Sequence, residues 1–161
     1  MSNYETKLEE MGYSLPIAAK PSFDYVPVVV HHDIAYVSGQ LPKVEGEVKV
    51  KGEVPAVVSI EEAKEAAITC ILQGLACIKQ HTGSLDAIEK IIKITGYVQS
   101  SEGFDAQPRV IDAASALLGS VFGEKGRHAR AAIGVNALPR STPVEIEMIA
   151  AINKEGDFYG K

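Results

Sequence analysis

The chain has 161 residues, of which 46% are hydrophobic and 23% charged, and its formal net charge is −5 at pH 7. This composition supports one domain with a hydrophobic core and excludes a largely disordered chain. The negative balance argues against a general nucleic-acid binder and against docking on anionic membranes. Residues 1–12 are too polar for a signal peptide, and no apolar run approaches the roughly 20 residues of a membrane helix. We therefore expect a soluble, cytoplasmic protein.

The first third of the chain predicts a short helix followed by a β-hairpin. Residues 3–13 have the pattern of a helix. Two β-rich runs, at 25–30 and 34–38, are separated by a His-His-Asp turn, which is typical of a hairpin. Pro27 lacks an amide N–H, so its strand must lie at a sheet edge or a bulge. Residues 45–51 alternate valine with charge and glycine and predict a short exposed strand or a loop.

Two longer helices are predicted from their end signals. Ser59 and Glu62 form a capping box, in which each side chain satisfies a free amide of the first helical turn. Apolar residues then recur at helical spacing until Gly83, a natural helix end. A second helix is predicted near Pro108, which suits a first helical position, and it should end at Gly123.

Three further strands are predicted at residues 87–99, 129–135 and 144–152. The order of elements predicts an α+β fold, a mixed sheet with two helices on one face. Several strands are apolar on consecutive residues, as at 28–30 and 91–92, so both of their faces should be buried. Because two helices can cover only one face, we expect the other face to contact another copy of the chain.

The sequence shows no internal repeat and no linker between domains. We interpret residues 1–20 as an N-terminal helical extension and residues 21–161 as a single domain. Cys70 and Cys77 lie about two turns apart on one predicted helix, which is too far for a disulfide within the subunit. We expect both to be small, buried apolar side chains.

The sequence lacks the motifs of metal and nucleotide sites. His31 and His32 are adjacent on an extended segment, so their side chains should point to opposite faces. His81 and His128 have no partner at metal-ligand spacing, and no glycine-rich phosphate loop is present. Ser38 follows a strand but lacks the flanking pattern of a nucleophile elbow. We therefore expect neither a metal nor an organic cofactor.

Charged residues stand inside two of the apolar strands. Arg130 enters the strand at 129–135, and Glu145 and Glu147 share one face of the strand at 144–152. One interpretation is a solvated strand face with surface ion pairs, which contribute little. The alternative is a buried arginine, whose planar guanidinium would need a carboxylate from the protein or from a small ligand.

Two segments resemble a known family. Residues 36–42, Tyr-Val-Ser-Gly-Gln-Leu-Pro, are similar to the Ser-Gly-Gln-hydrophobe-Pro signature of Rid (YjgF/YER057c/UK114) proteins. The segment 128–130, the gap to Leu138-Pro139, and the segment 144–150 resemble the C-terminal signature of that family, with matching spacing. The similarity spans residues 21–152, and the leading extension resembles a longer-chain branch.

The resemblance implies a chorismate-mutase-like fold, assembled as a homotrimer with ligand clefts between subunits. It implies that Arg130 holds the carboxylate of a 2-imino or 2-enamino acid and that Glu145 positions or activates water. Tyr25, Ser38 and Gly39 would line the cleft. Water would attack the imine carbon and ammonia would leave, giving a 2-oxo acid without a metal or cofactor. The expected partner is thus a small metabolite that carries a carboxylate.

One position departs from the family pattern, and other functions stay open. Asp112 stands where many relatives carry asparagine, and an acid there would either repel an anionic substrate or simply be exposed. A non-catalytic site for 2-oxo acids would share Arg130 and the trimer. A ribonuclease or translation inhibitor, the label of some relatives, is disfavoured by the acidic composition. A chorismate-mutase reaction rests on the fold alone.

Overall fold

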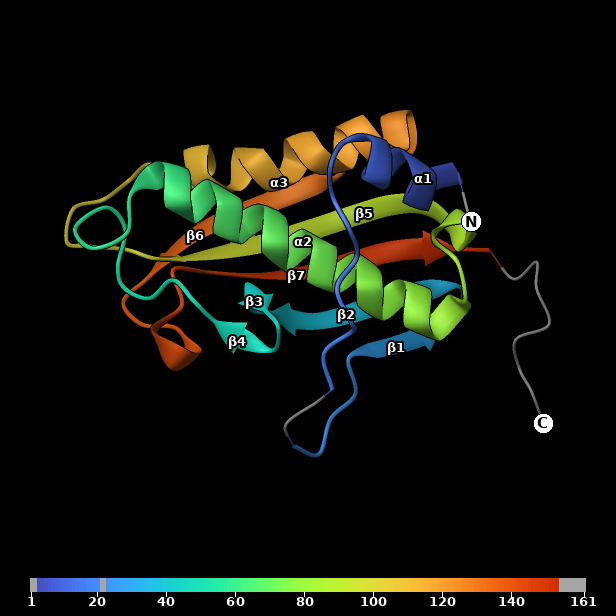
Figure 1. Cartoon of the computed structure of the whole chain (residues 1–161), viewed down its shortest axis with the longest axis horizontal. Coiled ribbons are helices and arrows are strands. Elements are labelled where there is room, and N and C mark those ends of the chain that lie inside the picture. The colour runs from blue at the N-terminus through green and yellow to red at the C-terminus, as the bar shows by residue number, and fades with distance from the viewer. Residues whose placement is uncertain (1–2, 21–22, 154–161) are drawn as a thin grey trace.

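A five-stranded mixed sheet forms the centre of the molecule (Figure 1). The computed structural model describes residues 3–20 and 23–153. The strand order is β1-β2-β7-β5-β6, in which β6 runs parallel to β5 and the other neighbours are antiparallel. The strands are β1 (Val28–His31), β2 (Ile34–Gln40), β5 (Ile88–Gln99), β6 (Ala129–Val135) and β7 (Val144–Ile152). The predicted mixed sheet is confirmed.

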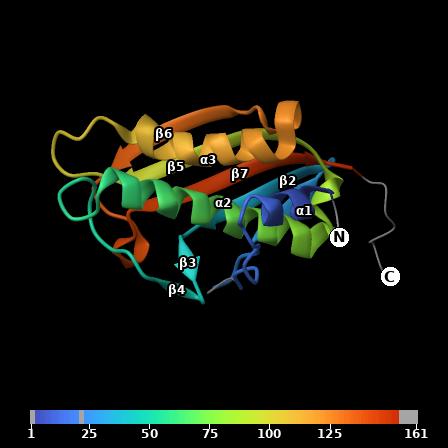
Figure 2. The ribbon, with the colours of Figure 1, turned by 45° about the horizontal axis from the view of Figure 1, so that its top comes forward.

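Two long helices, α2 (Ile60–Thr82) and α3 (Gln107–Phe122), lie side by side on one face of this sheet (Figures 1 and 2). The capping box of α2 is formed as predicted, with Ser59 Oγ accepting from the Glu62 amide and the Glu62 carboxylate accepting from the Ser59 amide. Gly83 ends α2 with a left-handed φ of 86°. The predicted α+β fold with two helices on one face is confirmed.

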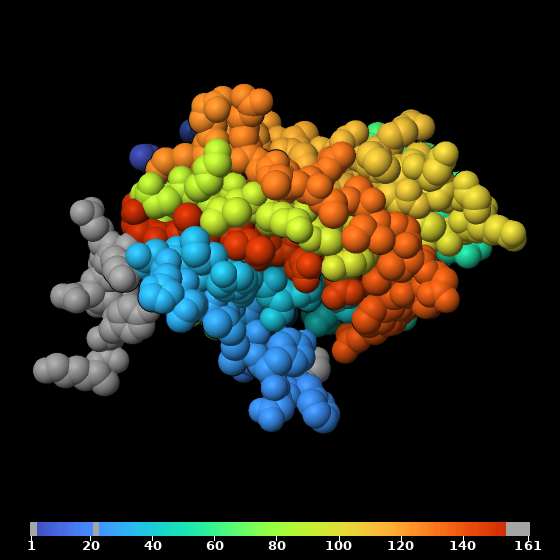
Figure 3. Space-filling view, turned by 180° about the vertical axis from the view of Figure 1, so that it is seen from behind, coloured from blue at the N-terminus to red at the C-terminus, as the bar shows by residue number. Residues whose placement is uncertain are grey.

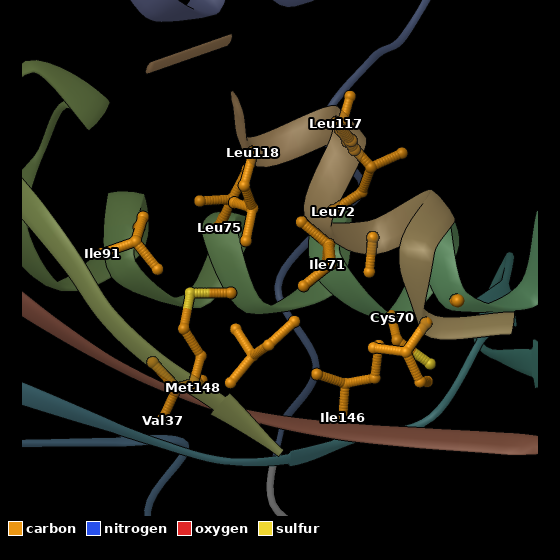
Figure 4. Close-up of a cluster of buried hydrophobic side chains, with 14 of the residues drawn as sticks. Val37, Cys70, Ile71, Leu72, Leu75, Ile91, Leu117, Leu118, Ile146 and Met148 are labelled. Carbon is orange, nitrogen blue, oxygen red and sulfur yellow. The ribbon is translucent and has the colours of Figure 1, made fainter. Parts of the chain in front are cut away.

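The hydrophobic core lies between this sheet face and the two helices (Figure 4). Val37 and Met148 rise from the sheet, Ile71 and Leu75 descend from α2, and Leu118 closes the gap from α3. Alternate residues of β2 and β7 enter this core, because neighbouring strand residues point to opposite faces. The strand pattern therefore fixes which residues remain for the other face.

The other face of the sheet is formed by the strands themselves (Figure 3). Tyr36 is 47% exposed and Ile133 is 41% exposed on this face, and Val29, the pairing partner of Tyr36, is also exposed. The consecutive apolar residues of β1 are thus buried on the helix side and open to solvent on the other side. Within one chain, these apolar side chains remain uncovered on this face.

Several boundaries differ from the sequence expectations by a few residues. Strand β1 begins at Val28 rather than at residue 25, and it lies at the sheet edge that Pro27 requires. Helix α3 begins at Gln107, so Pro108 is its second residue. The segment 45–51 contributes to a small hairpin of β3 (Lys43–Val44) and β4 (Glu47–Val48).

The N-terminal segment packs on the domain. Helix α1 (Asn3–Glu10) ends before Gly12 and buries Leu8 in the core. The largely buried Glu5 carboxylate accepts a hydrogen bond from the Leu85 amide and lies 3.2 Å from Lys79 Nζ. Among the described residues, no helix is both long enough and apolar enough to cross a bilayer.

Candidate functional site

A cavity of about 190 Å³ brings together three of the predicted site residues. Tyr25, Gly39 and Glu145 all line it, although they come from the segment before β1, from β2 and from β7. Pairing of β2 with β7 places the two strands side by side and so joins Gly39 to Glu145. The expected association of these three residues is thus present within a single chain.

A β-bulge shapes the floor of this cavity. In the β2–β7 pairing Val37 faces Met148, but the next matched pair is Gln40 with Ile146. Strand β2 therefore carries one extra residue at Ser38-Gly39, and such bulges re-aim the side chains around them. A Cβ at Gly39 would collide with the Glu145 carboxylate, so the carboxylate can lie here only while residue 39 has no side chain. The missing side chain provides the space that Glu145 occupies.

Ser38 holds the wall of the cavity. Its hydroxyl donates to the Val26 carbonyl at 2.8 Å, and its amide donates to the Pro27 carbonyl at 2.9 Å. These bonds tie the segment that carries Tyr25 to β2. Ser38 was expected to line the cleft, whereas its hydroxyl is directed to the backbone that positions Tyr25.

Glu145 is the acidic residue among those that line this cavity. Burial raises the pKa of its carboxyl above the usual value, and the negative charge of Glu147 raises it further. Glu147 is exposed on the same strand face and accepts a hydrogen bond from the Tyr97 hydroxyl at 3.1 Å. Both carboxylates share one face of β7, as the alternation in the sequence predicted. A half-buried acid with a raised pKa is a common feature of catalytic sites.

Arg130 lies in a different part of the molecule. In the β5–β6 pairing it faces Ile94, which is buried beneath the helices, whereas Glu145 faces Tyr97 on the open side of the sheet. The two residues are therefore on opposite faces, and β5 separates their strands. A single chain does not bring the expected carboxylate anchor and the expected acid together.

The guanidinium of Arg130 is held from one side by α3. Its Nη1 donates to Asp112 Oδ1 at 2.8 Å and to Ser115 Oγ at 3.3 Å. The Arg130 side chain is 25% exposed and that of Asp112 is 63% exposed, so the guanidinium is partly buried and a carboxylate of the protein pairs with it. No described residue bonds to Nε or Nη2, and this second edge has the fork geometry that a carboxylate accepts.

The Glu145 cavity is also lined by three basic residues that the sequence did not mark as site residues. Lys20, Lys43 and Arg140 surround it, and Arg140 has a left-handed φ of 58°. Arg140 directly follows the Leu138-Pro139 signature, which was the available signal. Neither lysine is marked by a motif, because only tertiary packing brings them to the cavity.

The described part of the chain contains no group of three or more His, Cys, Asp or Glu side chains placed to share a metal ion. Cys70 and Cys77 are both free and buried. Burial raises the pKa of each thiol, which keeps it in the unreactive protonated form. The two cysteines thus behave as the apolar core residues that the sequence predicted.

Comparison with known proteins gives consistent results. The family model described as endoribonuclease L-PSP matches residues 16–152. Protein TCP17 of Trypanosoma cruzi is 38% identical over 91% of this chain and 92% of its own. The crystal structure of protein Atu1372 from Agrobacterium tumefaciens is 42% identical, with a TM-score of 0.87 over 93% of this chain and 92% of that one. A structure from Shewanella oneidensis is 27% identical, with a TM-score of 0.90 over 94% of this chain and all of that one.

Proposed function

Because this chain belongs to the endoribonuclease L-PSP family, the YjgF/Rid proteins, we propose that it hydrolyses reactive 2-enamino and 2-imino acids to 2-oxo acids and ammonia. The ligand is a small metabolite with a carboxylate next to the reacting carbon. The reaction needs no metal and no organic cofactor in this proposal, because water is the second substrate. We expect the protein to act in the cytoplasm.

The free edge of Arg130 is the observation that carries this proposal. Asp112 and Ser115 both bind Nη1, which fixes the plane of the guanidinium and leaves Nε and Nη2 for a ligand. A planar carboxylate on that edge would accept two parallel hydrogen bonds. The side chain is already ordered by α3, so less conformational entropy is lost when the ligand binds.

Glu145 supplies the second function, proton transfer to and from water. In its ionised form the carboxylate accepts a proton from the attacking water, and the oxygen adds to the imine carbon. That proton goes to the nitrogen and gives a carbinolamine. Glu145 then transfers the hydroxyl proton to the nitrogen while the carbon–nitrogen bond breaks, so ammonia leaves and the 2-oxo acid remains. A raised pKa makes Glu145 a stronger base than an ordinary glutamate. Imines hydrolyse readily, so positioning and modest proton transfer suffice.

The two parts of this site lie on opposite sheet faces, so the proposal requires more than one copy of the chain. A homotrimer would place the Arg130 edge of one subunit beside the Glu145 cavity of the next. The open sheet face supports this assembly, because Val29, Tyr36 and Ile133 leave apolar surface in water in one chain. Each cleft would then combine residues from two subunits.

The test uses the imino acid that an amino-acid oxidase releases from its substrate, with semicarbazide as a trap. The wild-type chain should lower trapping and speed release of the 2-oxo acid. Arg130→Ala removes the two charge-assisted hydrogen bonds that the ligand carboxylate would accept. A single such bond contributes roughly 1.5–3 kcal/mol, so we expect kcat/KM to fall at least about tenfold. Asp112→Asn keeps the geometry and removes a competing charge, so KM should fall.

A matched control separates the anchor from general charge effects. Arg127 lies three residues before Arg130, and its side chain is 75% exposed. Arg127→Ala removes the same charge and should leave the rate unchanged. If the wild-type chain leaves trapping unaltered for several amino acids, the hydrolytic proposal is wrong for them. Binding of 2-oxo acids that still depends on Arg130 would then identify a non-catalytic carboxylate site.

The family description names a ribonuclease, and the charge of this chain does not favour that activity. RNA binding rests on a basic surface, whereas the chain carries a net charge of −5. The three cations at the Glu145 cavity, Lys20, Lys43 and Arg140, suit a small anion better than a polynucleotide backbone. We therefore propose no nucleic-acid partner.

A further inference from the structure

A pair of polar side chains, Ser115 and His128, lies beside Arg130, and the proposed imine hydrolysis uses only Ser115, as a partner that orders the guanidinium. Ser115 lies in the middle of α3, and His128 lies two residues before Arg130. Ser115 Oγ is 2.9 Å from His128 Nε2, and His128 Nδ1 is 2.6 Å from the Gly126 carbonyl oxygen. Both side chains are half-buried. The Ser115 hydroxyl, the His128 imidazole and the Gly126 carbonyl thus form a chain of hydrogen bonds.

The hydrogen-bond partners determine the tautomer of His128. A carbonyl oxygen can only accept, so Nδ1 carries the proton that bonds to Gly126. The lone pair of the neutral ring is then on Nε2, where it accepts the hydroxyl proton of Ser115. A nucleophile bonded to a base that a third group orients is the arrangement that activates serine in covalent catalysis.

Gly126 fixes the orienting carbonyl in place. A Cβ at this residue would collide with the Leu118 carbonyl of α3, so only glycine allows the turn to pack this closely. The turn, a 3₁₀ segment at Gly123–Gly126, leads directly into His128 and β6. Close packing on α3 therefore sets the position of the Gly126 oxygen, which in turn sets the His128 ring against Ser115.

Arg130 places a positive charge at the same oxygen. Its Nη1 lies 3.3 Å from Ser115 Oγ and donates to it, and the same Nη1 also donates to Asp112. A cation here favours negative charge that develops on an attacking oxygen or on an acyl oxygen nearby. Base, nucleophile and charge stabiliser thus meet within one chain, without the Glu145 cavity.

We propose that Ser115 is an activated nucleophile that hydrolyses small activated carboxylic esters, with His128 as its base. Ser115 Oγ attacks the acyl carbon while its proton passes to His128 Nε2. The ester C–O bond breaks, the alcohol takes the proton, and an acyl-serine remains. Water then loses a proton to His128 and releases the acid, which restores Ser115. This activity shares Arg130 with the proposed imine hydrolysis but does not use the Glu145 cavity.

The test measures covalent labelling of the full-length chain by a biotin-tagged fluorophosphonate, with the adduct located by peptide mass spectrometry. We expect the adduct on Ser115, and release of 4-nitrophenol from 4-nitrophenyl acetate by the same residue. Ser115→Ala should abolish both, and alanine is well tolerated in a helix. Loss of a general base costs a factor of about 10² or more, so His128→Gln should slow labelling at least hundredfold.

Ser120→Ala is the matched control, because Ser120 lies exposed on the same helix and has no histidine partner among the described residues. It should label and hydrolyse as the wild-type chain does. His128→Gln retains a hydrogen-bond acceptor but not a base at neutral pH, so a purely structural Ser115–His128 bond predicts unchanged labelling in this variant. That result, or an absence of any adduct on Ser115 in the folded wild-type chain, would overturn the proposal.

Discussion

Glu145 shows how one side chain acquires its properties from its neighbours. The strand pattern buries Val144 and Ile146 and turns Glu145 to the opposite face, where the missing side chain of Gly39 leaves room for it. Partial burial and the charge of Glu147 both disfavour the ionised form and raise the pKa of Glu145. The same two causes predict how the activity and the stability change with pH.

The rate of imine hydrolysis should fall at low pH with the ionisation of Glu145. Since its pKa is raised, the fall in kcat/KM should begin at a higher pH than the ordinary glutamate value of 4.5 would give. Glu147→Gln removes the neighbouring charge, so the acidic limb of the pH profile, where kcat/KM falls, should move to lower pH. Glu145→Gln should abolish the limb, and a limb that persists in this variant would contradict the assignment.

Stability should show the opposite dependence. The folded chain holds its Glu145 proton more tightly than the unfolded chain, so the free energy of unfolding falls as pH rises from about 4.5 through the raised pKa. Glu145→Gln has no titrating carboxyl at this position, so its free energy of unfolding should not show this fall. The free energy of unfolding, measured with denaturant at both ends of this pH range, should therefore fall less in Glu145→Gln than in the wild-type chain as pH rises.

At the scale of elements, the bulge in β2 is what makes the Glu145 cavity. Gly39→Ala would place a Cβ where the Glu145 carboxylate lies, so the carboxylate must move. We expect a loss of kcat larger than any change in melting temperature, measured on the same preparation. Gly119→Ala is the control, because its Cβ would meet nothing within 4 Å and alanine favours the helix by roughly 0.5–1 kcal/mol. Equal effects of both changes on kcat would contradict this role of Gly39.

The elements themselves were largely predictable, and the reasons are local. The bounds of β6 and β7 follow from their apolar runs, and both ends of α2 follow from Ser59 and Gly83. Tyr25 was placed inside a strand because the sequence around it is β-rich, whereas β1 starts only after Pro27. The bulge at Ser38-Gly39 could not be predicted, since it exists only through the pairing of β2 with β7.

The site was only partly predictable for a related reason. The family resemblance pointed to Arg130 and Glu145, but the spacing of its motifs says nothing of which face of the sheet each residue occupies. The lysines of the cavity and the bond between Ser115 and His128 join segments by packing, so no sequence pattern marks them. Asp112 was noted as a departure, and only the structure reveals that it binds Arg130.

At the scale of the whole molecule, the proposed trimer rests on the open sheet face, where Val29, Tyr36 and Ile133 are exposed. Ile133→Lys places a charge on this face and should reduce self-association, because burying an unpaired charge is costly. The wild-type chain should sediment as a species of three times 17.2 kDa, and the variant as smaller species. Ile17→Lys is the control, since Ile17 is 94% exposed and lies outside the sheet. A monomeric wild-type chain would contradict the assembled site.

The parallel pairing of β5 with β6 has a further consequence, because α3 is the crossover that joins these two strands. Asp112, Ser115, His128 and Arg130 all belong to this one supersecondary unit, within 18 residues of each other. The Glu145 cavity, in contrast, depends on β2, near the edge of the sheet, pairing with a strand from the far end of the chain. Short-range contacts form early in folding and tend to open together. We therefore expect local opening at the β1–β2 edge to dismantle the Glu145 cavity and to leave Arg130 bound to α3, so the proposed proton transfer would be lost while the proposed carboxylate anchor would persist.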